Sequence, residues 1–496
     1  MNRQIRRVTI FVGILMLAVV VNLDWVQVIH GAAYRDNDAN QRVLLDEYKR
    51  QRGLIELQTG GTPIAESVST NDALRYLRRY ANGPLYAPIT GYNSPFYGQS
   101  QIEGSEDSVL SGNDDRLFVQ RLANLLTGRD PRGGNVLVTI NAQAQAAAYA
   151  AMGNRRGAVV ALDPSTGAIL AAVSTPSFDP NKLSSHSADS LKKAYDGYIN
   201  DKNDPLANRA FTETYPPGSV FKVVVAAAAL KNGRTPTSRI PAVNALTLPG
   251  TTTQLRNFDG EQCADGKTDT LDHALTISCN TAFAQLGMDL GADTLRQEAA
   301  LFGIDDNDFT VPVRVAGSTI GPVADKASLA QSSIGQRDVR ITPLQGAMIA
   351  AAVANNGDLK TPYLVSEEQG PNLATLSHTD PISLHQVMTA DQAAELNKMM
   401  QDVVNNGTGT AAQIPGIKVA GKTGTADNGP QRANGSYVNP PHAWFSGFAP
   451  ADNPKIAVAV IIENGGVAGN ETTGGLAAAP VAKAVMQAYL TSLGIR

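Results

Sequence analysis

The stretch Tyr215-Pro216-Pro217-Gly218-Ser219-Val220-Phe221-Lys222 decides the fold class of this chain. Behind Ser219 runs an apolar segment from Val220 to Leu230 that is interrupted only by Lys222 and closed by Lys231-Asn232-Gly233. A basic last turn followed by glycine is typical of a helix C-terminus, so the segment predicts a buried helix with Ser219 in its first turn. Positions i and i+3 share one helix face, and we therefore expect the Lys222 amine to reach the Ser219 hydroxyl.

Two further motifs follow in order, Ser278-Cys279-Asn280 and Lys422-Thr423-Gly424-Thr425. Each motif is weak alone, since S-x-x-K also occurs at Ser190-Leu191-Lys192-Lys193 and S-x-N at Ser69-Thr70-Asn71 and Ser111-Gly112-Asn113. The surroundings of Ser190 are polar and predict a solvated segment, so this copy is discarded. Three motifs in this order predict a serine that is acylated during catalysis.

The residue types fit that chemistry. A serine hydroxyl needs an adjacent base, and a lysine can serve when burial and a neighbouring positive charge lower its pKa. We predict Ser219 as nucleophile, Lys222 as base and Lys422 as the neighbouring cation. Ser278 would pass the proton to the leaving amine, and Asn280 would hold the amide of the acyl group. The alternative is an ordinary helix start with a lysine whose stem alone is buried.

The third motif also predicts substrate contacts. The backbone N–H groups of Ser219 and Thr425 are the expected oxyanion hole, helped by the positive end of the helix. Lys422 and the hydroxyls of Thr423 and Thr425, on either side of Gly424, are expected to bind a substrate carboxylate.

A competing motif overlaps this one. Gly416 to Thr423 matches G-x-x-x-x-G-K-[ST], the phosphate-binding loop of nucleotide hydrolases. That loop needs a strand before its first glycine and a helix after its lysine. Here Ile417 to Ala420 reads as the strand itself, and Thr423 to Pro430 cannot start a helix, so the nucleotide reading is disfavoured.

Composition excludes several other functions. The 496 residues leave room for two or three domains, and 41 basic against 45 acidic residues give a formal charge of −4. With no basic block beyond the N-terminus, nucleic acid is not an expected partner. The six histidines form no H-E-x-x-H and the two cysteines no C-x-x-C, so neither a metal site nor a cofactor is predicted.

The N-terminus predicts a membrane anchor. Arg3, Arg6 and Arg7 precede an apolar run from Val8 to Val21 that continues to Val28 and so reaches spanning length. We favour an uncleaved single span over residues 1–30 with a cytoplasmic N-terminus and the rest of the chain outside. The alternative is a signal peptide cleaved near Gly31-Ala32-Ala33.

The later chain predicts an α+β domain. Gly157 to Val173 reads as a β-hairpin, and further strands are expected at Lys418 to Ala420, Ala443 to Phe448 and Lys455 to Ile462. A helix is expected from Pro480 to Leu493. Strands at both ends with helices between them predict one antiparallel sheet covered on both faces.

The chain resembles the class B penicillin-binding proteins, nearly end to end. Besides the three motifs, the resemblance rests on Arg52-Gly53-Leu54-Ile55, Gly157 to Pro164, Thr166 to Leu170, Ser333-Ile334-Gly335-Gln336, Thr342-Pro343-Leu344-Gln345 and Ala443 to Pro450. Cys279 departs from many relatives, but the expected roles belong to its neighbours.

The resemblance implies a penicillin-binding transpeptidase fold, with a five-stranded antiparallel sheet between helical layers. Residues 153–496 would form this domain, and the turn-rich residues 31–152 a pedestal that ends in the helix-like Ala142 to Ala151. It further implies a D,D-transpeptidase that cross-links peptidoglycan stem peptides and is acylated by β-lactams. A glycosyltransferase of the shape, elongation, division and sporulation (SEDS) type is the implied partner, bound through the membrane helix and the pedestal.

Two alternatives stay open. A D,D-carboxypeptidase or β-lactamase would pass the acyl group to water, which the anchor and pedestal disfavour. A scaffold or β-lactam sensor would be acylated without turnover, and a sensor would normally need a signalling domain across the membrane, where about seven residues precede the span.

Cys263 and Cys279 are the only cysteines. In a domain outside the cytoplasm, such a pair usually forms one bridge, and closing a loop of this length would stabilise the fold by about 3 kcal/mol in the chain-entropy model. A bridge would tie the segment around Cys263 to the second motif. The alternative is a pair of free thiols, with Cys279 buried as a small apolar side chain.

Overall fold

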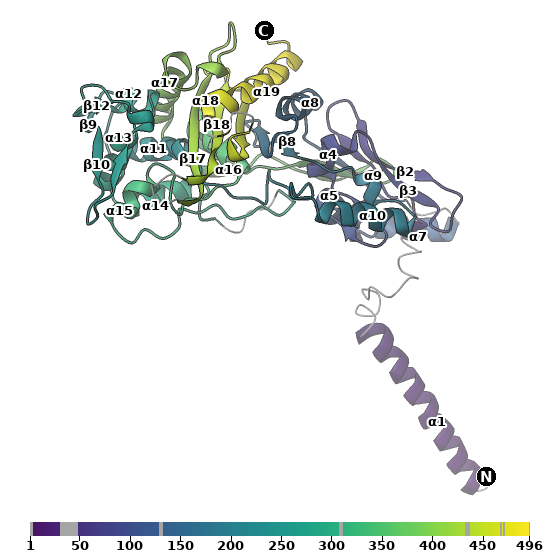
Figure 1. Cartoon of the computed structure of the whole chain (residues 1–496). Coiled ribbons are helices and arrows are strands. Elements are labelled where there is room, and N and C mark those ends of the chain that lie inside the picture. The colour runs from purple at the N-terminus through teal and green to yellow at the C-terminus, as the bar shows by residue number, and fades with distance from the viewer. Residues whose placement is uncertain are drawn as a thin grey trace.

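The computed structural model describes residues 3–29, 48–127, 132–306, 311–431, 437–466, 469 and 472–495 (Figure 1). Two sheets organise the chain beyond residue 48, one of five strands and one of six. Residues 30–47, which include the predicted boundary between anchor and pedestal, lie outside the described part.

The five-stranded sheet is antiparallel throughout, as the sequence predicted, with the order β17-β18-β19-β7-β8. Its strands are β7 (Gly157–Leu162), β8 (Ile169–Thr175), β17 (Ala420–Gln431), β18 (Tyr437–Ala449) and β19 (Ile456–Ile462). The expected strand at Lys418 to Ala420 was placed too early, because β17 starts at Ala420 and runs through the third motif.

Both faces of this sheet are covered, which explains why every residue of β19 is buried. Alternate side chains of a strand point to opposite faces. Ala457, Ala459 and Ile461 join the core cluster that contains helix α16 (Pro343–Ala354), whereas Val458, Val460 and Ile462 join the cluster of α8 (Ala142–Met152) and α19 (Ala479–Ser492). The sheet therefore forms the middle of three layers.

Helix α8 corrects one expectation. The sequence placed this helix at the end of the pedestal, but it packs against α19 and β8 and so covers the five-stranded sheet. Its buried residues Ala144, Ala148 and Met152 belong to the same core cluster as α19. The helix propensity of an alanine-rich segment fixes that a helix forms, but not the sheet against which it packs.

The helices between residues 222 and 332, together with the helix at residues 390–406, lie at the end of the molecule away from the pedestal (Figure 1). The helices there are α11 (Lys222–Lys231), α12 (Leu271–Thr276), α13 (Asn280–Leu290), α14 (Ala292–Leu301), α15 (Lys326–Ser332) and α17 (Ala390–Asn406), and α18 (Gly474–Ala477) lies against β17 and β18. The short strand pairs are β9 (Arg239–Pro241) with β12 (Thr268–Thr270), β10 (Ala245–Thr247) with β11 (Gln254–Arg256), and β13 (Asp358–Lys360) with β16 (Ser383–Gln386).

The six-stranded sheet forms the pedestal, in the order β15-β14-β6-β1-β2-β3. Its strands are β1 (Ile55–Leu57), β2 (Thr62–Ser69), β3 (Tyr76–Tyr80), β6 (Asn135–Val138), β14 (Val365–Gln369) and β15 (Thr375–His378). Strands β14 and β15 come from far beyond residue 152. The sheet therefore contains residues from both sides of the expected domain boundary.

Short elements surround the pedestal sheet. They are α4 (Gly83–Thr90), α5 (Gln101–Ser105), α6 (Asp107–Leu110), α7 (Phe118–Thr127), α9 (Pro180–Leu183), α10 (Ala188–Ile199) and the strand pair β4 (Asn93–Ser94) with β5 (Gly98–Gln99). Helix α9 packs against β3 and α4, and α10 packs against α9, so these residues also belong to the pedestal in space.

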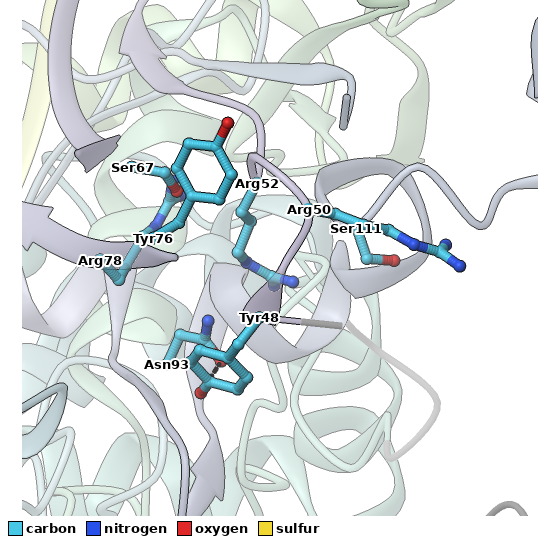
Figure 2. A pocket seen from close by; sticks show the side chains of 8 residues that line it. All are labelled: Tyr48, Arg50, Arg52, Ser67, Tyr76, Arg78, Asn93 and Ser111. Carbon is cyan, nitrogen blue, oxygen red and sulfur yellow. Dashed lines mark hydrogen bonds between the residues drawn. The ribbon is translucent and has the colours of Figure 1, made fainter. Parts of the chain in front are cut away.

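A buried charge cluster lies within the pedestal, and two of its members, Arg52 and Arg78, line the pocket drawn in Figure 2. The two carboxylate oxygens of Glu103, which is fully buried, accept hydrogen bonds from Arg52 Nε and Arg78 Nε at 2.6 Å each. Burial opposes ionisation of Glu103, but Arg78 and Arg52 together hold its pKa below the ordinary value. The Arg52-Gly53 motif thus has a structural role, since breaking such a buried pair is strongly destabilising.

Helix α1 (Arg3–Asp24) continues as a π-helix from Trp25 to Ile29. The 25 residues Arg3–Gln27 are long and apolar enough to cross a membrane, and none of the residues of α1 is buried by the rest of the protein. A helix that is apolar on every side needs an apolar surrounding such as lipid.

Candidate active site

Ser219 lies in a tight turn that two other segments clamp. A 3₁₀ turn, Gly218–Phe221, leads directly into α11, which places Ser219 at the helix start as predicted. Gly218 has a φ of 54°, and its N–H donates to Gly335 O at 2.9 Å. A Cβ atom at position 218 would lie 2.6 Å from Thr425 O, so only glycine lets β17 approach the turn this closely.

Lys222 is fully buried, and its amine points at the second motif. Nζ donates to Ser278 O at 2.7 Å and Asn280 Oδ1 at 2.8 Å, and it lies 3.3 Å from Ser278 Oγ. Burial, and after it the charge of Lys422, lower the pKa of Lys222 well below its ordinary value. Both effects favour the neutral form of the amine, which is the form that can accept a proton.

Lys422 reaches the same serine from the other side. Its Nζ donates to Ser278 Oγ at 2.9 Å and to Thr423 O at 3.1 Å. Burial lowers the pKa of Lys422 to about 7. The Ser278 hydroxyl thus joins two amines that come from positions 222 and 422, and a proton can pass along this row.

Ser278 has an unusual backbone conformation. Its φ is 63°, in the left-handed region that non-glycine residues rarely adopt. Such strain persists only where the surroundings fix it, and it is concentrated at functional sites.

The interior position of Lys422 in β17 contradicts the nucleotide reading. Lys422 pairs with Ser446, and each residue from Ala420 to Ala426 has a partner in β18. A phosphate-binding lysine lies in a loop before a helix, and this geometry is absent at Gly416 to Thr423.

The remaining residues of the third motif line the same strand. Thr423 Oγ1 lies 2.6 Å from Thr408 Oγ1, and Thr425 Oγ1 accepts from Gly474 N at 3.3 Å. A Cβ atom at Gly424 would lie 2.5 Å from Pro217 O, so this glycine also permits the close approach of the Ser219 turn. Thr423 and Thr425 share one face of the strand, as joint binding of one carboxylate requires.

One expected contact is missing. Among the described residues, no hydrogen bond joins the Ser219 hydroxyl to Lys222, whose amine donates to Ser278 and Asn280 instead. The 3₁₀ turn at residues 218–221 still places positions 219 and 222 on one face, so the spacing does not explain the missing contact. The Lys222 amine is instead held towards the second motif by Ser278 O and Asn280 Oδ1. Catalytic hydrogen bonds often shorten only when substrate is bound, so the pairing of Ser219 with Lys222 stays a prediction.

The structure joins Cys263 and Cys279 by a disulfide, with the Cα atoms 6.1 Å apart. The bridge connects the loop before β12 to the middle residue of the second motif. Both residues are buried.

The motifs did not reveal several supporting residues. Trp444 Nε1 donates to Pro216 O at 3.0 Å, and Tyr215 OH donates to Glu463 Oε1 at 2.8 Å, so the segment before Ser219 is held from β18 and from the residue that follows β19. Arg209 Nε lies 2.9 Å from the same carboxylate oxygen. Trp444 lies within the segment Ala443 to Pro450 that resembles the family, and this resemblance was the one available signal for it. No sequence signal pointed to Glu463 or Arg209.

No group of three histidine, cysteine or acidic residues that could hold a metal ion occurs within the described ranges. The chemistry that the site offers is that of its hydroxyls and amines. A serine at a helix start, a buried lysine with a lowered pKa, a second serine and a second lysine define a serine acyltransferase of the lysine-activated class.

The comparisons with known proteins agree with this class. Residues 157–487 match the penicillin binding protein transpeptidase domain, and residues 52–136 match the penicillin binding protein A dimerisation domain. The chain therefore belongs to the penicillin-binding protein transpeptidase family.

Similar proteins cover the whole length. The chain is 46% identical over 495 residues to the peptidoglycan D,D-transpeptidase PbpA of Mycolicibacterium smegmatis, with 99% of each chain covered. It superposes on the ceftriaxone acyl-enzyme complex of penicillin-binding protein A from Mycobacterium tuberculosis with a TM-score of 0.86, at 47% identity over 90% of this chain and 100% of that one. A D,D-transpeptidase domain from Eggerthella lenta matches with a TM-score of 0.76 at 31% identity, covering 90% of this chain and 99% of that one.

Proposed function

We propose that this protein is a peptidoglycan D,D-transpeptidase that cross-links stem peptides through a serine acyl-enzyme and is inhibited by β-lactams. The observation that carries the proposal is the row Lys222, Ser278 and Lys422 beside the clamped Ser219 turn, in a chain that matches such enzymes from end to end.

In the first half-reaction, Ser219 Oγ attacks the carbonyl of the penultimate D-alanine of a donor stem peptide. Lys222 takes the hydroxyl proton, because burial and Lys422 lower the pKa of its amine and it follows Ser219 by three positions. The peptide bond breaks, and the terminal D-alanine leaves as a free amine after receiving a proton by way of Ser278. The donor peptide stays bound to Ser219 as an ester.

In the second half-reaction, an amine of a neighbouring stem peptide attacks this ester. The amine loses a proton to the same lysine and serine, a new amide forms, and Ser219 regains its proton. A β-lactam enters by the same first step, but its ring opens without releasing a leaving group, so the ester persists.

Substrate binding uses the third motif. The backbone N–H groups of Ser219 and Thr425 stabilise the oxyanion, and Asn280 holds the amide of the acyl group. The charged form of Lys422 and the hydroxyls of Thr423 and Thr425 bind the terminal carboxylate of the donor. The close approach of β17 to the Ser219 turn, which Gly218 and Gly424 permit, supports this arrangement.

Intact-protein mass spectrometry after incubation with penicillin tests the nucleophile. The wild type should gain the mass of one penicillin at Ser219, and Ser219→Ala should gain none. Ser190→Ala, which changes the exposed second copy of the S-x-x-K motif, is the matched control and should label normally. Labelling of Ser219→Ala would remove Ser219 from its role.

A transfer assay separates the alternatives. With a lipid-linked or nascent glycan as substrate, a transpeptidase releases cross-linked dimers together with D-alanine. A carboxypeptidase releases D-alanine without dimers, a β-lactamase frees hydrolysed penicillin, and a scaffold or sensor stays acylated and forms no product.

We further propose that α1 is an uncleaved span with its N-terminus in the cytoplasm. Arg3, Arg6 and Arg7 at its start support this orientation by the positive-inside rule. A reporter enzyme that works only outside the cytoplasm should be active when it is fused to the C-terminus. Activity of a reporter that works only in the cytoplasm would instead reverse the proposed topology.

The partner proposed for α1 and the pedestal is a SEDS-type glycosyltransferase. Asn22 and Asp24 are costly when they face lipid, which favours contact with another membrane protein. Replacing residues 1–30 by an unrelated anchor should abolish co-purification with this polymerase, whereas β-lactam labelling should persist. Co-purification that survives the replacement would refute the contribution of the helix.

A further inference from the structure

Asn257 lies outside all three motifs, but its side chain contacts the start of the second one. Its Oδ1 accepts hydrogen bonds from the backbone N–H groups of Asn280 at 2.9 Å and Thr281 at 3.0 Å, and from Thr281 Oγ1 at 3.3 Å. Its Nδ2 donates to Glu261 O at 3.0 Å, and the residue is buried. Both the oxygen and the nitrogen of this amide thus bond to groups of the protein.

These contacts replace a helix cap that the local sequence cannot provide. The first N–H groups of a helix have no partner within the helix and normally bond to the N-cap side chain. The N-cap residue of α13 is Cys279, which makes no side-chain cap hydrogen bond because its sulfur is bonded to Cys263. Asn257, 23 positions before Asn280, supplies the acceptor oxygen instead.

The capped residue is the one that faces Lys222. Asn280 Oδ1 accepts from the Lys222 amine at 2.8 Å, while Asn280 Nδ2 donates to Arg256 O at 3.3 Å. The Arg256-Asn257 pair therefore holds both the backbone and the amide of Asn280. Two residues before, Ser278 keeps its strained backbone only while the start of α13 is fixed.

We propose that Asn257 is a positioning residue for acylation, which sets Ser278 and Asn280 at their distances from Lys222 and Lys422. It acts through these residues and does not touch the substrate. The inference rests on the proposed function, and labelling of the wild type at Ser219 tests that function separately.

The test is the rate of acylation by penicillin in the full-length Asn257→Ala variant, with initial binding and chemistry separated by stopped-flow measurement. Displacement of a proton relay by a fraction of an ångström to 1 Å should slow the acylation step by about 10- to 100-fold. The dissociation constant of the initial complex should change less than about threefold, because the third motif binds the carboxylate.

A matched control separates positioning from simple capping. Asn141 caps α8 through Oδ1, which accepts from Ala144 N at 2.9 Å, on the far side of the five-stranded sheet. Asn141→Ala should lose similar thermal stability and acylate at the wild-type rate. If Asn257→Ala also acylates at the wild-type rate, Asn257 is only a cap and the proposal is overturned.

A second variant keeps the proposal testable if Asn257→Ala does not fold. Asn257→Asp retains the acceptor oxygen and should acylate within about fivefold of the wild type. The Asn257→Asp protein could instead fold and still acylate about 10- to 100-fold more slowly than the wild type, as is expected for the alanine variant. That result would show that the acceptor oxygen does not position the motif.

Discussion

At the residue scale, the active site depends on two lysines that share one hydroxyl but carry different charges. Lys222 and Lys422 both approach Ser278 Oγ, at 3.3 and 2.9 Å, and both are buried. Two buried cations at such a separation repel strongly, so one amine gives up its proton. The pKa of Lys222 is lowered further, because Lys422 acts on it in addition to burial.

Removing the amine of Lys222 should abolish most acylation without changing the fold. Lys222→Met keeps the side-chain volume but cannot accept a proton, and acylation by penicillin should slow by about 10²- to 10⁴-fold. Lys193→Ala, in the exposed second S-x-x-K copy on α10, is the control and should leave the rate unchanged. A Lys222→Met protein that acylates normally would mean that another group is the base.

The charge of Lys422 predicts a pH dependence. Its pKa of about 7 means that the charged form prevails below pH 7 and is lost as the pH rises through this value. The second-order rate constant of acylation by penicillin should therefore fall on the alkaline side by up to about tenfold per pH unit, because the carboxylate loses its cation. Penicillin methyl ester, which has no carboxylate, should show no such fall. An equal fall with the ester would mean that Lys422 does not bind the carboxylate.

At the element scale, three glycines let separate segments meet at the nucleophile. Gly335, with a φ of 71°, accepts the Gly218 N–H, and an added Cβ at Gly335 would collide with Gly218 O. Gly218 and Gly424 play the same part between the turn and β17. The position of Ser219 is thus set by backbone contacts rather than by its own side chain.

Gly335→Ala should therefore slow acylation beyond the effect of its loss of stability. Gly233→Ala is the control, because Gly233 has a similar φ of 79° but nothing within 4 Å of an added Cβ. Both variants should lose about 1–2 kcal/mol of unfolding free energy from the left-handed backbone. Gly335→Ala should lose more than Gly233→Ala, because its Cβ atom also collides with Gly218 O. Only Gly335→Ala should slow penicillin acylation, by at least about tenfold. Equal acylation in the two would mean that the turn tolerates displacement.

At the scale of the whole molecule, the pedestal and the catalytic layers are one folded unit. Strand β14 lies between β15 and β6, and the Thr139 N–H donates to Leu364 O at 2.9 Å where the two regions meet. Buried Gln145 on α8 bonds to Leu85 O of the pedestal and to Ala172 O of β8, both at 2.9 Å. These contacts join the catalytic domain directly to the pedestal.

A break in β14 should therefore destabilise the catalytic sheet as well. Glu367→Pro removes an N–H from a strand paired on both sides and should cost at least about 1–3 kcal/mol. In a Trp25→Phe background, Trp444 is the only tryptophan, and its fluorescence reports on β18. The Trp444 unfolding midpoint in urea should fall together with the far-UV circular dichroism midpoint.

Glu367→Ala, which keeps the backbone N–H, is the control and should change both midpoints little. A Trp444 midpoint that is unmoved by Glu367→Pro, with an earlier transition in circular dichroism, would instead show that the two regions unfold independently.

The sequence by itself determined the chemistry and the main fold class. The three motifs are short and contiguous, so Ser219, Lys222, Ser278 and Lys422 could be recognised without knowing what lies near them. The same holds for the apolar N-terminal span, the hairpin β7-β8 and the helix α19, whose periodic patterns depend only on neighbouring residues.

The tertiary structure alone decided which distant segments meet. Nothing local in Val365–His378 indicates that these strands complete the pedestal, or that α8 covers the catalytic sheet instead. The same is true of Asn257 as a cap for α13 and of the Ser278 hydroxyl between amines 56 and 144 positions away. Sheet edges and buried hydrogen-bond donors pair with whichever partner the complete packing brings near. A pattern confined to a few consecutive residues cannot identify that partner.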